Sequence, residues 1–357
     1  MNVHADEITT DAPYVLMETM TGRILKEHNS DTVVPMGTMN KIMTVLLTAE
    51  AVSSGNLKMD DMLTASSAAN EAKGASIWLM PGEKMSVNDL LKGVIIGNAN
   101  DACIVLAESI GGTTERFVDM MNMKAQEIGM KNTVFTSPCG VDDENQHTTA
   151  CDIALAACRL TKYEFLNESM STWMTYLRED KTELVNENRL VRTYKGISGI
   201  KAGNSEKSGF SVVASANRGN DKFVAAVMGC HDKDERFTVA RDLLNLGFWS
   251  YKTIIPGFST ELMKPVKVKG GNDAAVDIEA YDLCPLVVPK WAEGQMEAVM
   301  LVPEYISAPV KKGQVIGNVA FYAGDTMIYD TPLIASTDVR KRDLFSCAKR
   351  IIVKMFK

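Results

Sequence analysis

The sequence predicts an α/β protein in which a larger domain of helices and antiparallel strands is followed by a small all-β sandwich domain. Stretches of helical length alternate with strand-and-turn segments as far as Leu246. Past Pro256-Gly257 the chain changes to short strand-like runs, and near Asp338 it changes again to a basic amphipathic segment. We therefore expect three parts, which span 1–258, 259–336 and 337–357.

The composition is that of a folded protein with a sizeable core. The 357 residues exceed the length of one ordinary domain, and 46% of them are hydrophobic against 23% charged. A net charge of −7 argues against general nucleic-acid binding, so no nucleic-acid partner is expected. No run approaches the roughly 18 consecutive apolar residues of a transmembrane helix.

The first domain is expected to open with a hairpin and to continue through helices. Tyr14–Glu18 and Arg23–Leu25 flank a turn at Gly22, which predicts two paired strands. Apolar periodicity and capping signals predict helices over 38–52, 86–95, 102–110, 114–129 and 149–163. A second hairpin and a closing helix are expected over 196–216, 222–228 and 234–246.

The second domain and the C-terminal segment have different patterns. Between Pro265 and Ala335, short apolar runs separated by Gly, Pro and Asp turns predict a β-sandwich. From Asp338 to Lys357, apolar residues fall on one face of a helix and basic residues mostly on the other. In an acidic protein this favours an anchor on an anionic membrane surface; a helix packed on its own β-domain is the alternative.

The cysteines and histidines form no recognisable pattern. Seven cysteines include no C-x-x-C pair, and the four histidines do not cluster with them. An odd, scattered set is also not a disulfide framework. We therefore expect no metal, no cofactor and free thiols.

The stretch Thr38-Met39-Asn40-Lys41 is the first candidate for chemistry. Lys41 lies in the first turn of a predicted helix, where the helix dipole disfavours a cation, and apolar residues follow it. A hydroxyl and an amine three residues apart meet on one helical face, and a partly desolvated lysine can deprotonate a hydroxyl nucleophile. A capping threonine beside a lysine that reaches solvent explains the same residues without chemistry.

Two more polar groups interrupt apolar segments. Asn98-Ala99-Asn100 separates two apolar helices, so its amides need tertiary partners or face a binding site; an ordinary interhelical turn is the alternative. Lys201-Ala202-Gly203 places a lysine at a strand end beside a glycine that lets a ligand approach the backbone. A solvated strand-end lysine explains that pattern equally.

The order of these three groups resembles a known set of motifs. T-x-x-K, N-A-N and K-A-G resemble the S-x-x-K, S-x-N and K-T-G motifs of penicillin-binding proteins and β-lactamases. Flanking residues such as Lys41-Ile42-Met43-Thr44 and Asn100-Asp101-Ala102 are similar to the low-molecular-mass D-alanyl-D-alanine carboxypeptidases, peptidase family S11. The resemblance covers nearly the whole chain. It implies a transpeptidase-like domain that cleaves peptidoglycan stem peptides ending in D-Ala-D-Ala through an acyl-enzyme.

The resemblance also implies the site. Its members are Thr38, Lys41, Asn98, Asn100, Lys201, Ala202, Gly203 and Ser205. Thr38 would be the nucleophile and Lys41 its general base. Asn100 would contact Lys41 and the substrate amide, and Lys201 would supply positive potential. The backbone N–H groups of Thr38 and Ser205 would hold the oxyanion.

Three positions depart from the family's pattern. Thr38 replaces a serine, and its methyl group restricts rotation of the hydroxyl. Asn98 replaces a serine that relays a proton, and Ala202 replaces a threonine that binds the substrate's terminal carboxylate. One lost hydrogen bond to a charged group costs about 1.5–3 kcal/mol. Two functions therefore remain open: a slow carboxypeptidase that also reacts with β-lactams, or a non-catalytic homologue that binds wall peptide or a partner protein.

The N-terminus and the basic segment together suggest a location. Val3-His4-Ala5 has small residues at the −3 and −1 positions of a signal-peptidase site, before Asp6-Glu7. Our hypothesis is a protein exported to the outer face of the bacterial cytoplasmic membrane, with its leader removed and with 338–357 as a peripheral anchor. N-terminal sequencing of the protein from its native host tests this, and an uncleaved Met1 would contradict it.

Overall fold

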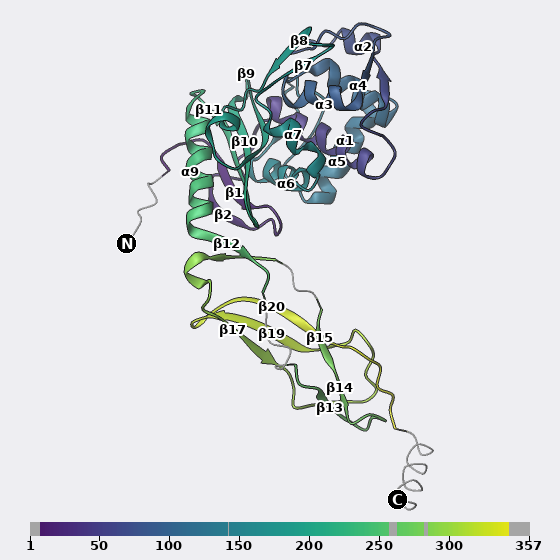
Figure 1. Ribbon diagram of the computed structural model, residues 1–357, viewed down its shortest axis with the longest axis vertical. Helices are drawn as coiled ribbons and strands as arrows, with labels where there is room; N and C mark the ends of the chain where they lie inside the picture. Colours follow the sequence, from purple (N-terminus) through teal and green to yellow (C-terminus); the bar gives the residue numbers. More distant parts are fainter. Residues whose placement is uncertain (1–7, 142, 257–262, 282–284, 343–357) are drawn as a thin grey trace, which may run out of the picture. The chain divides into compact units, whose positions relative to one another are not determined.

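The computed structural model describes residues 8–141, 143–256, 263–281 and 285–342 (Figure 1). The chain divides into two compact units between Ser250 and Tyr251. The expected basic amphipathic helix lies almost entirely outside the described residues, which end at Arg342. Within the described ranges, no helix combines the length and the apolar character needed to cross a membrane.

A five-stranded antiparallel sheet forms the centre of the first unit, in the order β2-β1-β11-β10-β9. The strands are β1 Tyr14–Glu18, β2 Ile24–His28, β9 Ile197–Ser205, β10 Gly209–Arg218 and β11 Asp221–Cys230. Both expected hairpins are therefore confirmed. The N-terminal hairpin joins the late one through β1 and β11, which leaves β9 at the edge of the sheet.

Helices cover both faces of this sheet (Figure 1). They are α1 Lys41–Ser53, α2 Ser67–Asn70, α3 Val87–Ile95, α4 Asn100–Gly111, α5 Thr114–Ile128, α6 Ala150–Leu160, α7 Asn167–Ser171, α8 Leu190–Thr193 and α9 Glu235–Ser250. In β11, Phe223 packs its ring against Phe248 of α9, while the next residue, Val224, joins the core formed with α1, α3, α4 and α6. All five residues of β1 are buried as a result.

Local signals located most helix ends correctly. Ser86 accepts a hydrogen bond from the backbone N–H of Asp89 at the start of α3, and Thr149 caps α6 in the same way. Near Thr38 the prediction was wrong in detail. A short 3-10 helix, η1 Gly37–Asn40, comes first, α1 begins at Lys41, and no side chain caps either one. Thr38 is therefore not a capping residue.

Short strand pairs in the first unit were not predicted. They are β3 Val34–Pro35 with β6 His147–Thr148, β4 Met62–Thr64 with β5 Lys84–Ser86, and β7 Met174–Leu177 with β8 Thr182–Val185. The β7–β8 hairpin matters for the site, because a Cβ added at Gly97 would lie 2.8 Å from Leu184 of β8. The segment that follows β8 is thereby placed beside the Asn98 turn.

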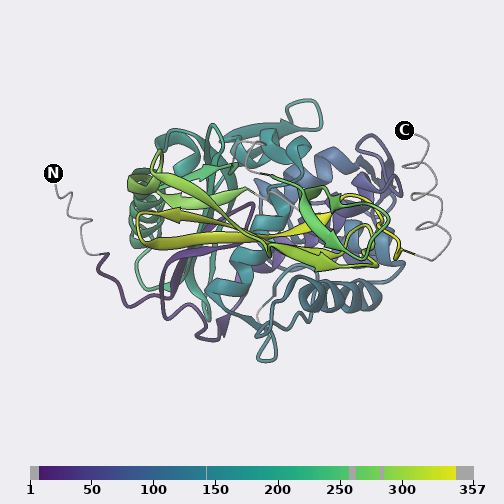
Figure 2. The same ribbon diagram turned by 90° about the horizontal axis from the view of Figure 1, so that it is seen from below.

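The second unit is all-β, apart from one 3-10 turn, within the residues described, as expected (Figure 2). Its strands are β12 Tyr251–Ile254, β13 Val266–Lys269, β14 Ala275–Val276, β15 Ile278–Ala280, β16 Leu286–Pro289, β17 Met296–Leu301, β18 Tyr305–Ser307, β19 Val315–Ala323 and β20 Thr326–Ala335. Sheets β14-β13-β18 and β15-β20-β19-β17 contribute side chains such as Val268 and Phe321 to one core. None of the candidate site residues belongs to this unit.

Candidate active site

Thr38 lies directly against the edge strand β9. A Cβ added at Gly203 would lie 2.4 Å from Thr38 Cβ and 2.6 Å from its Oγ1, so a side chain at 203 has no room. The Thr38 hydroxyl donates to the carbonyl oxygen of Asn204 at 3.3 Å. Gly203 was expected to admit a ligand to the backbone; in the structure it admits the side chain of Thr38.

Lys41 is buried and has a defined partner. Lys41 is only 4% exposed, and its Nζ donates to the carbonyl oxygen of Cys139 at 2.6 Å. The loop that carries Cys139 is fixed to η1, because Asn40 Nδ2 donates to the carbonyl oxygen of Ser137 at 2.9 Å. The alternative in which Lys41 extends into solvent is therefore wrong. Lys41 follows Thr38 by three residues, where η1 passes into α1.

Lys201 lies in the middle of β9 and is 3% exposed, so its expected position at a strand end was wrong. Its Nζ donates to the carbonyl oxygens of Val94 at 2.5 Å and Ile95 at 2.8 Å, which satisfies carbonyls at the C-terminal end of α3. Burial, together with the positive charge of Lys41, lowers the pKa of Lys201 to about 7. Two lysines therefore share one site from different elements.

Asn98 presents an unpaired acceptor. Its backbone has a φ of +57°, in the left-handed region, and its Nδ2 donates to Glu187 Oε2 at 3.0 Å. Because an ionised carboxylate only accepts hydrogen bonds, this contact fixes the orientation of the amide. Oδ1 of Asn98 is buried and has no hydrogen-bond partner. A donor from a bound molecule would satisfy it.

Asn100 is held by a neighbouring loop and does not bond Lys41. Its backbone N–H donates to the carbonyl of Ala75 at 2.7 Å, and Nδ2 donates to the carbonyl of Lys73 at 2.6 Å. Its Oδ1 is buried without a partner. The expected hydrogen bond with Lys41 is therefore wrong, because the backbone N–H and the side-chain Nδ2 of Asn100 both donate to backbone carbonyls. Oδ1 of Asn100, like that of Asn98, remains an acceptor without a partner.

Ser205 is near Thr38, but its backbone N–H is already engaged. That N–H donates to Ser208 Oγ at 3.1 Å, and the Ser205 hydroxyl donates to the same oxygen at 2.7 Å. Both serine side chains lie close to Gly37, the residue before Thr38. An oxyanion could therefore use the Ser205 N–H only after displacing Ser208 Oγ. Ala202, buried in β9, contributes no hydroxyl.

Three residues of this site were missed from the sequence. Ser208 is one, and the others are Glu187 and Arg236. Arg236 is buried and donates from Nη1 to the carbonyls of Gly203 at 2.6 Å and Ser211 at 3.0 Å, and from Nη2 to Glu187 Oε1 at 3.0 Å. A cation in the first turn of α9 is the same anomaly that identified Lys41. Nothing local distinguishes Glu187.

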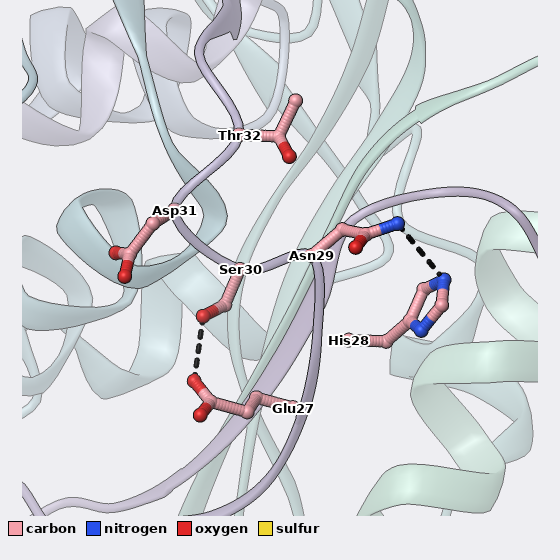
Figure 3. Close-up of a pocket in the computed structure, with 6 residues that line it drawn as sticks. All are labelled: Glu27, His28, Asn29, Ser30, Asp31 and Thr32. Carbon is pink, nitrogen blue, oxygen red and sulfur yellow. Dashed lines mark hydrogen bonds between the residues drawn. The ribbon is translucent and has the colours of Figure 1, made fainter.

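A separate hollow of about 640 Å³ lies in the turn after β2 and contains none of these residues (Figure 3). It is lined by Glu27, His28, Asn29, Ser30, Asp31 and Thr32. Ser30 Oγ donates to Glu27 Oε2 at 2.6 Å, whereas the ring of His28 faces Asn29. Since the serine and the histidine are not paired, this turn offers no activated nucleophile.

The described residues also contain no group of three or more His, Cys, Asp and Glu side chains that could hold a metal ion. Five cysteines among them are free, at 103, 139, 151, 158 and 230. Burial raises the pKa of the Cys103 thiol, close to the two lysines, to about 12. This thiol is protonated at neutral pH and is a poor nucleophile.

The sheet, its helices and the placement of the hydroxyl and lysine groups define a penicillin-binding-protein fold of the transpeptidase class. Comparison with family models agrees: D-alanyl-D-alanine carboxypeptidase, Peptidase_S11, matches residues 1–232, and the penicillin-binding protein 5 C-terminal domain matches 257–341. The chain belongs to the D-alanyl-D-alanine carboxypeptidase family, peptidase family S11.

Individual relatives support this assignment over most of the chain. D-alanyl-D-alanine carboxypeptidase DacF of Bacillus subtilis is 34% identical over 340 residues, which cover 94% of this chain and 87% of that protein. The crystal structure of penicillin-binding protein 5 from Haemophilus influenzae superposes with a TM-score of 0.85 at 29% identity, covering 93% and 98%. Penicillin-binding protein D2 from Listeria monocytogenes, in its ampicillin-bound form, gives 0.60 at 26%, covering 66% and 97%.

Proposed function

We propose that this protein is a D-alanyl-D-alanine carboxypeptidase that acts on peptidoglycan stem peptides, with Thr38 as its nucleophile. The observation that carries the proposal is the position of the Thr38 hydroxyl against the edge strand β9, with a buried Lys41 three residues later in the chain. Membership of the carboxypeptidase family supports the reaction type.

The reaction we propose proceeds in two steps. Thr38 Oγ1 attacks the carbonyl carbon of the penultimate D-alanine while Lys41 acts as general base and takes the hydroxyl proton. The peptide C–N bond breaks, the leaving D-alanine nitrogen receives a proton from Lys41, and the peptide remains as an ester on Thr38. Water, deprotonated by Lys41, then hydrolyses the ester and restores the hydroxyl. No cofactor enters either step.

The edge position of β9 supports the binding of an extended peptide. An edge strand presents unpaired backbone groups to which a peptide can add as a further strand. The unpartnered oxygens of Asn98 and Asn100 would accept N–H groups from that peptide. Lys201 supplies positive potential at the same edge, to a degree that depends on pH.

Three features make slow turnover the expected behaviour. The methyl group of Thr38 lies against Gly203 and restricts χ1, the Ser205 N–H is bonded to Ser208, and Ala202 offers no hydroxyl to the substrate's carboxylate. A non-catalytic homologue that binds wall peptide is the second reading. The unsatisfied acceptors at Asn98 and Asn100 are compatible with both.

The intact mass after incubation with a penicillin separates the two readings. A covalent adduct on the wild type that is absent from Thr38→Ala, and retained in the exposed control Thr32→Ala, supports Thr38 as nucleophile; D-alanine release from a D-Ala-D-Ala peptide then measures turnover. If no adduct forms at high penicillin concentration and no D-alanine is released, the carboxypeptidase proposal is wrong.

We further propose that the protein is exported and associates peripherally with an anionic membrane through 338–357. The support is the basic amphipathic pattern of that segment in a chain with a net charge of −7. The full chain should sediment with vesicles that contain anionic lipid and dissociate as salt is raised. Equal sedimentation with purely zwitterionic vesicles would contradict the electrostatic part of this proposal.

A further inference from the structure

The side chain of Trp78 is held in solvent between two buried neighbours. It is 75% exposed, whereas Ile77 and Leu79 on either side are each 1% exposed. The backbone of Trp78 has a φ of +55°, in the left-handed region, where a bulky residue is a genuine outlier. Burial of both neighbours keeps the indole on the outside. A large apolar side chain held outside by a strained backbone points to a binding role.

A buried carboxylate fixes the backbone on both sides of Trp78. Asp101 of α4 is 1% exposed and accepts from the N–H groups of Ile77 at 3.1 Å and Leu79 at 3.0 Å. It also accepts from Ser76 Oγ at 2.6 Å, and that oxygen in turn accepts from the Trp78 N–H at 2.9 Å. Hydrogen bonds to an ionised group are about twice as strong as neutral ones. The indole is therefore presented by an ordered backbone, which reduces the entropy lost when a ligand binds.

The same segment holds Asn100 of the proposed active site. The Asn100 N–H donates to the carbonyl of Ala75 at 2.7 Å, and its Nδ2 donates to the carbonyl of Lys73 at 2.6 Å. A Cβ added at Gly74 would lie 2.9 Å from Asn100 Nδ2, so the segment packs directly on this side chain. Because Trp78 follows Ala75 by three residues, their Cα atoms are at most about 11 Å apart. The exposed indole therefore belongs to the rim of the proposed site.

The substrate class supplies a partner for such a ring. Stem peptides of peptidoglycan are attached to a glycan strand of N-acetylhexosamine rings. The peptide before the scissile bond has about four residues and spans about 13 Å when extended, so the sugar at its other end stays close to the site. One face of a pyranose ring presents C–H groups, which the negative face of an indole attracts. The indole N–H can also donate to a hydroxyl or an N-acetyl oxygen.

We propose that Trp78 is a substrate-binding residue whose indole stacks on an N-acetylhexosamine ring of the glycan strand that carries the stem peptide. This inference rests on the proposed function and deepens it, because it adds a sugar subsite to the peptide site at β9. The protein then recognises the stem peptide as part of the wall polymer, and a free peptide uses only part of the site. Because neither the indole nor the sugar ring is charged, this contact should depend little on salt.

The test compares two ligands and four proteins. The ligands are a stem peptide ending in D-Ala-D-Ala and the same peptide attached to an N-acetylglucosaminyl-N-acetylmuramyl disaccharide. The proteins are the wild type, Trp78→Ala, Trp78→Phe and the matched control Trp291→Ala. Trp291 is 58% exposed and lies in η4, Lys290–Ala292, of the second unit. Release of D-alanine gives kcat and KM, and calorimetric titration gives Kd for both ligands and for a glycan strand without peptides.

The wild type should prefer the disaccharide peptide by about tenfold in kcat/KM, chiefly through KM, which is the scale of one aromatic contact. Trp78→Ala should bring the ratio of the two ligands close to one. Trp78→Phe keeps a ring face and should retain most of the preference. Trp291→Ala should leave the ratio at its wild-type value. Since the ratio compares two ligands on the same protein, a loss of folded material in a variant cancels.

The outcomes separate the inference from the function on which it rests. Equal kcat/KM for both ligands in the wild type, or a preference that survives in Trp78→Ala, overturns the role of Trp78 and leaves the carboxypeptidase proposal intact. An equal loss of preference in Trp291→Ala also overturns it. If no protein releases D-alanine and none is acylated by penicillin, the proposed function fails and Kd for the peptide-free glycan decides. Weaker binding by Trp78→Ala then supports the sugar subsite, whereas unchanged binding or none overturns it.

Discussion

Replacement of Gly203 by alanine should strongly slow acylation by displacing Thr38. The added Cβ would lie 2.4 Å from Thr38 Cβ and 2.5 Å from its Cγ2, whereas carbon atoms in contact prefer about 3.5–4.0 Å. One of the two segments must therefore move by about 1 Å or more. Strand β9 is held by Arg236 and Lys201, and η1 by the loop at Ser137, so neither can move without breaking hydrogen bonds.

The size of the effect follows from this displacement. A shift of about 1 Å at a catalytic group costs about 100-fold in rate, and overpacking a buried contact costs about 1–3 kcal/mol of folding free energy. The rate of penicillin acylation, followed by intact mass, should therefore fall by about 100-fold in Gly203→Ala, with a lowered melting temperature.

The control must lose stability without a change at the site. Gly219→Ala meets this need, because Gly219 has a φ of +65° and nothing within 4 Å of its added Cβ, so it is strained but not crowded. It should melt earlier and be acylated at the wild-type rate. Wild-type acylation of Gly203→Ala would refute the placement of Thr38 against β9.

Three further outcomes are expected. Thr38→Ser should speed acylation by roughly tenfold, because serine lacks the methyl group that lies against Gly203 and restricts χ1; an equal or slower rate in the mass assay would show that the methyl group is not limiting. Lys41→Met should slow acylation by at least about 100-fold with an unchanged circular dichroism spectrum, and a smaller loss would mean that another group takes the proton. The lowered pKa of Lys201, about 7 against 10.5, means that the unfolded chain binds more protons above pH 7, so stability should rise from pH 7 to 9. Chemical denaturation should show this rise in the wild type and not in Lys201→Met, and a flat wild-type profile would contradict it.

Local sequence signals were enough for most of the fold. The Ser86 cap of α3 and the two hairpins depend on residues close together in the chain, so periodicity and turn residues located them. The start of α1 was misplaced because η1 is shaped by tertiary contacts, including the close approach of Gly203 to Thr38. The short β7–β8 pair carries no strong pattern and was missed for the same reason.

The site residues also differ in whether a local sequence signal identifies them. Lys41 was singled out because a lysine in apolar surroundings is anomalous in the sequence alone, and Thr38 and Lys201 because of the spacing and order of the three motifs. Glu187 and Arg236 were not found, because they are linked to each other by a hydrogen bond between residues about fifty positions apart. The partners of Asn100 could not be foreseen either: they are backbone carbonyls, which leave no trace in residue identity.

The position of β1 has a consequence for how the protein folds. β1 pairs with β11 across some two hundred residues of chain, and the edge strand that faces Thr38 is added to the same sheet only through β10. Pairings of such long sequence separation close large loops and form slowly. A fragment that ends before β11 lacks the strand that joins β1 to β10, so we expect the sheet beside Thr38 to form only once Cys230 is available. The topology thereby ties the site we propose to complete folding of the first unit.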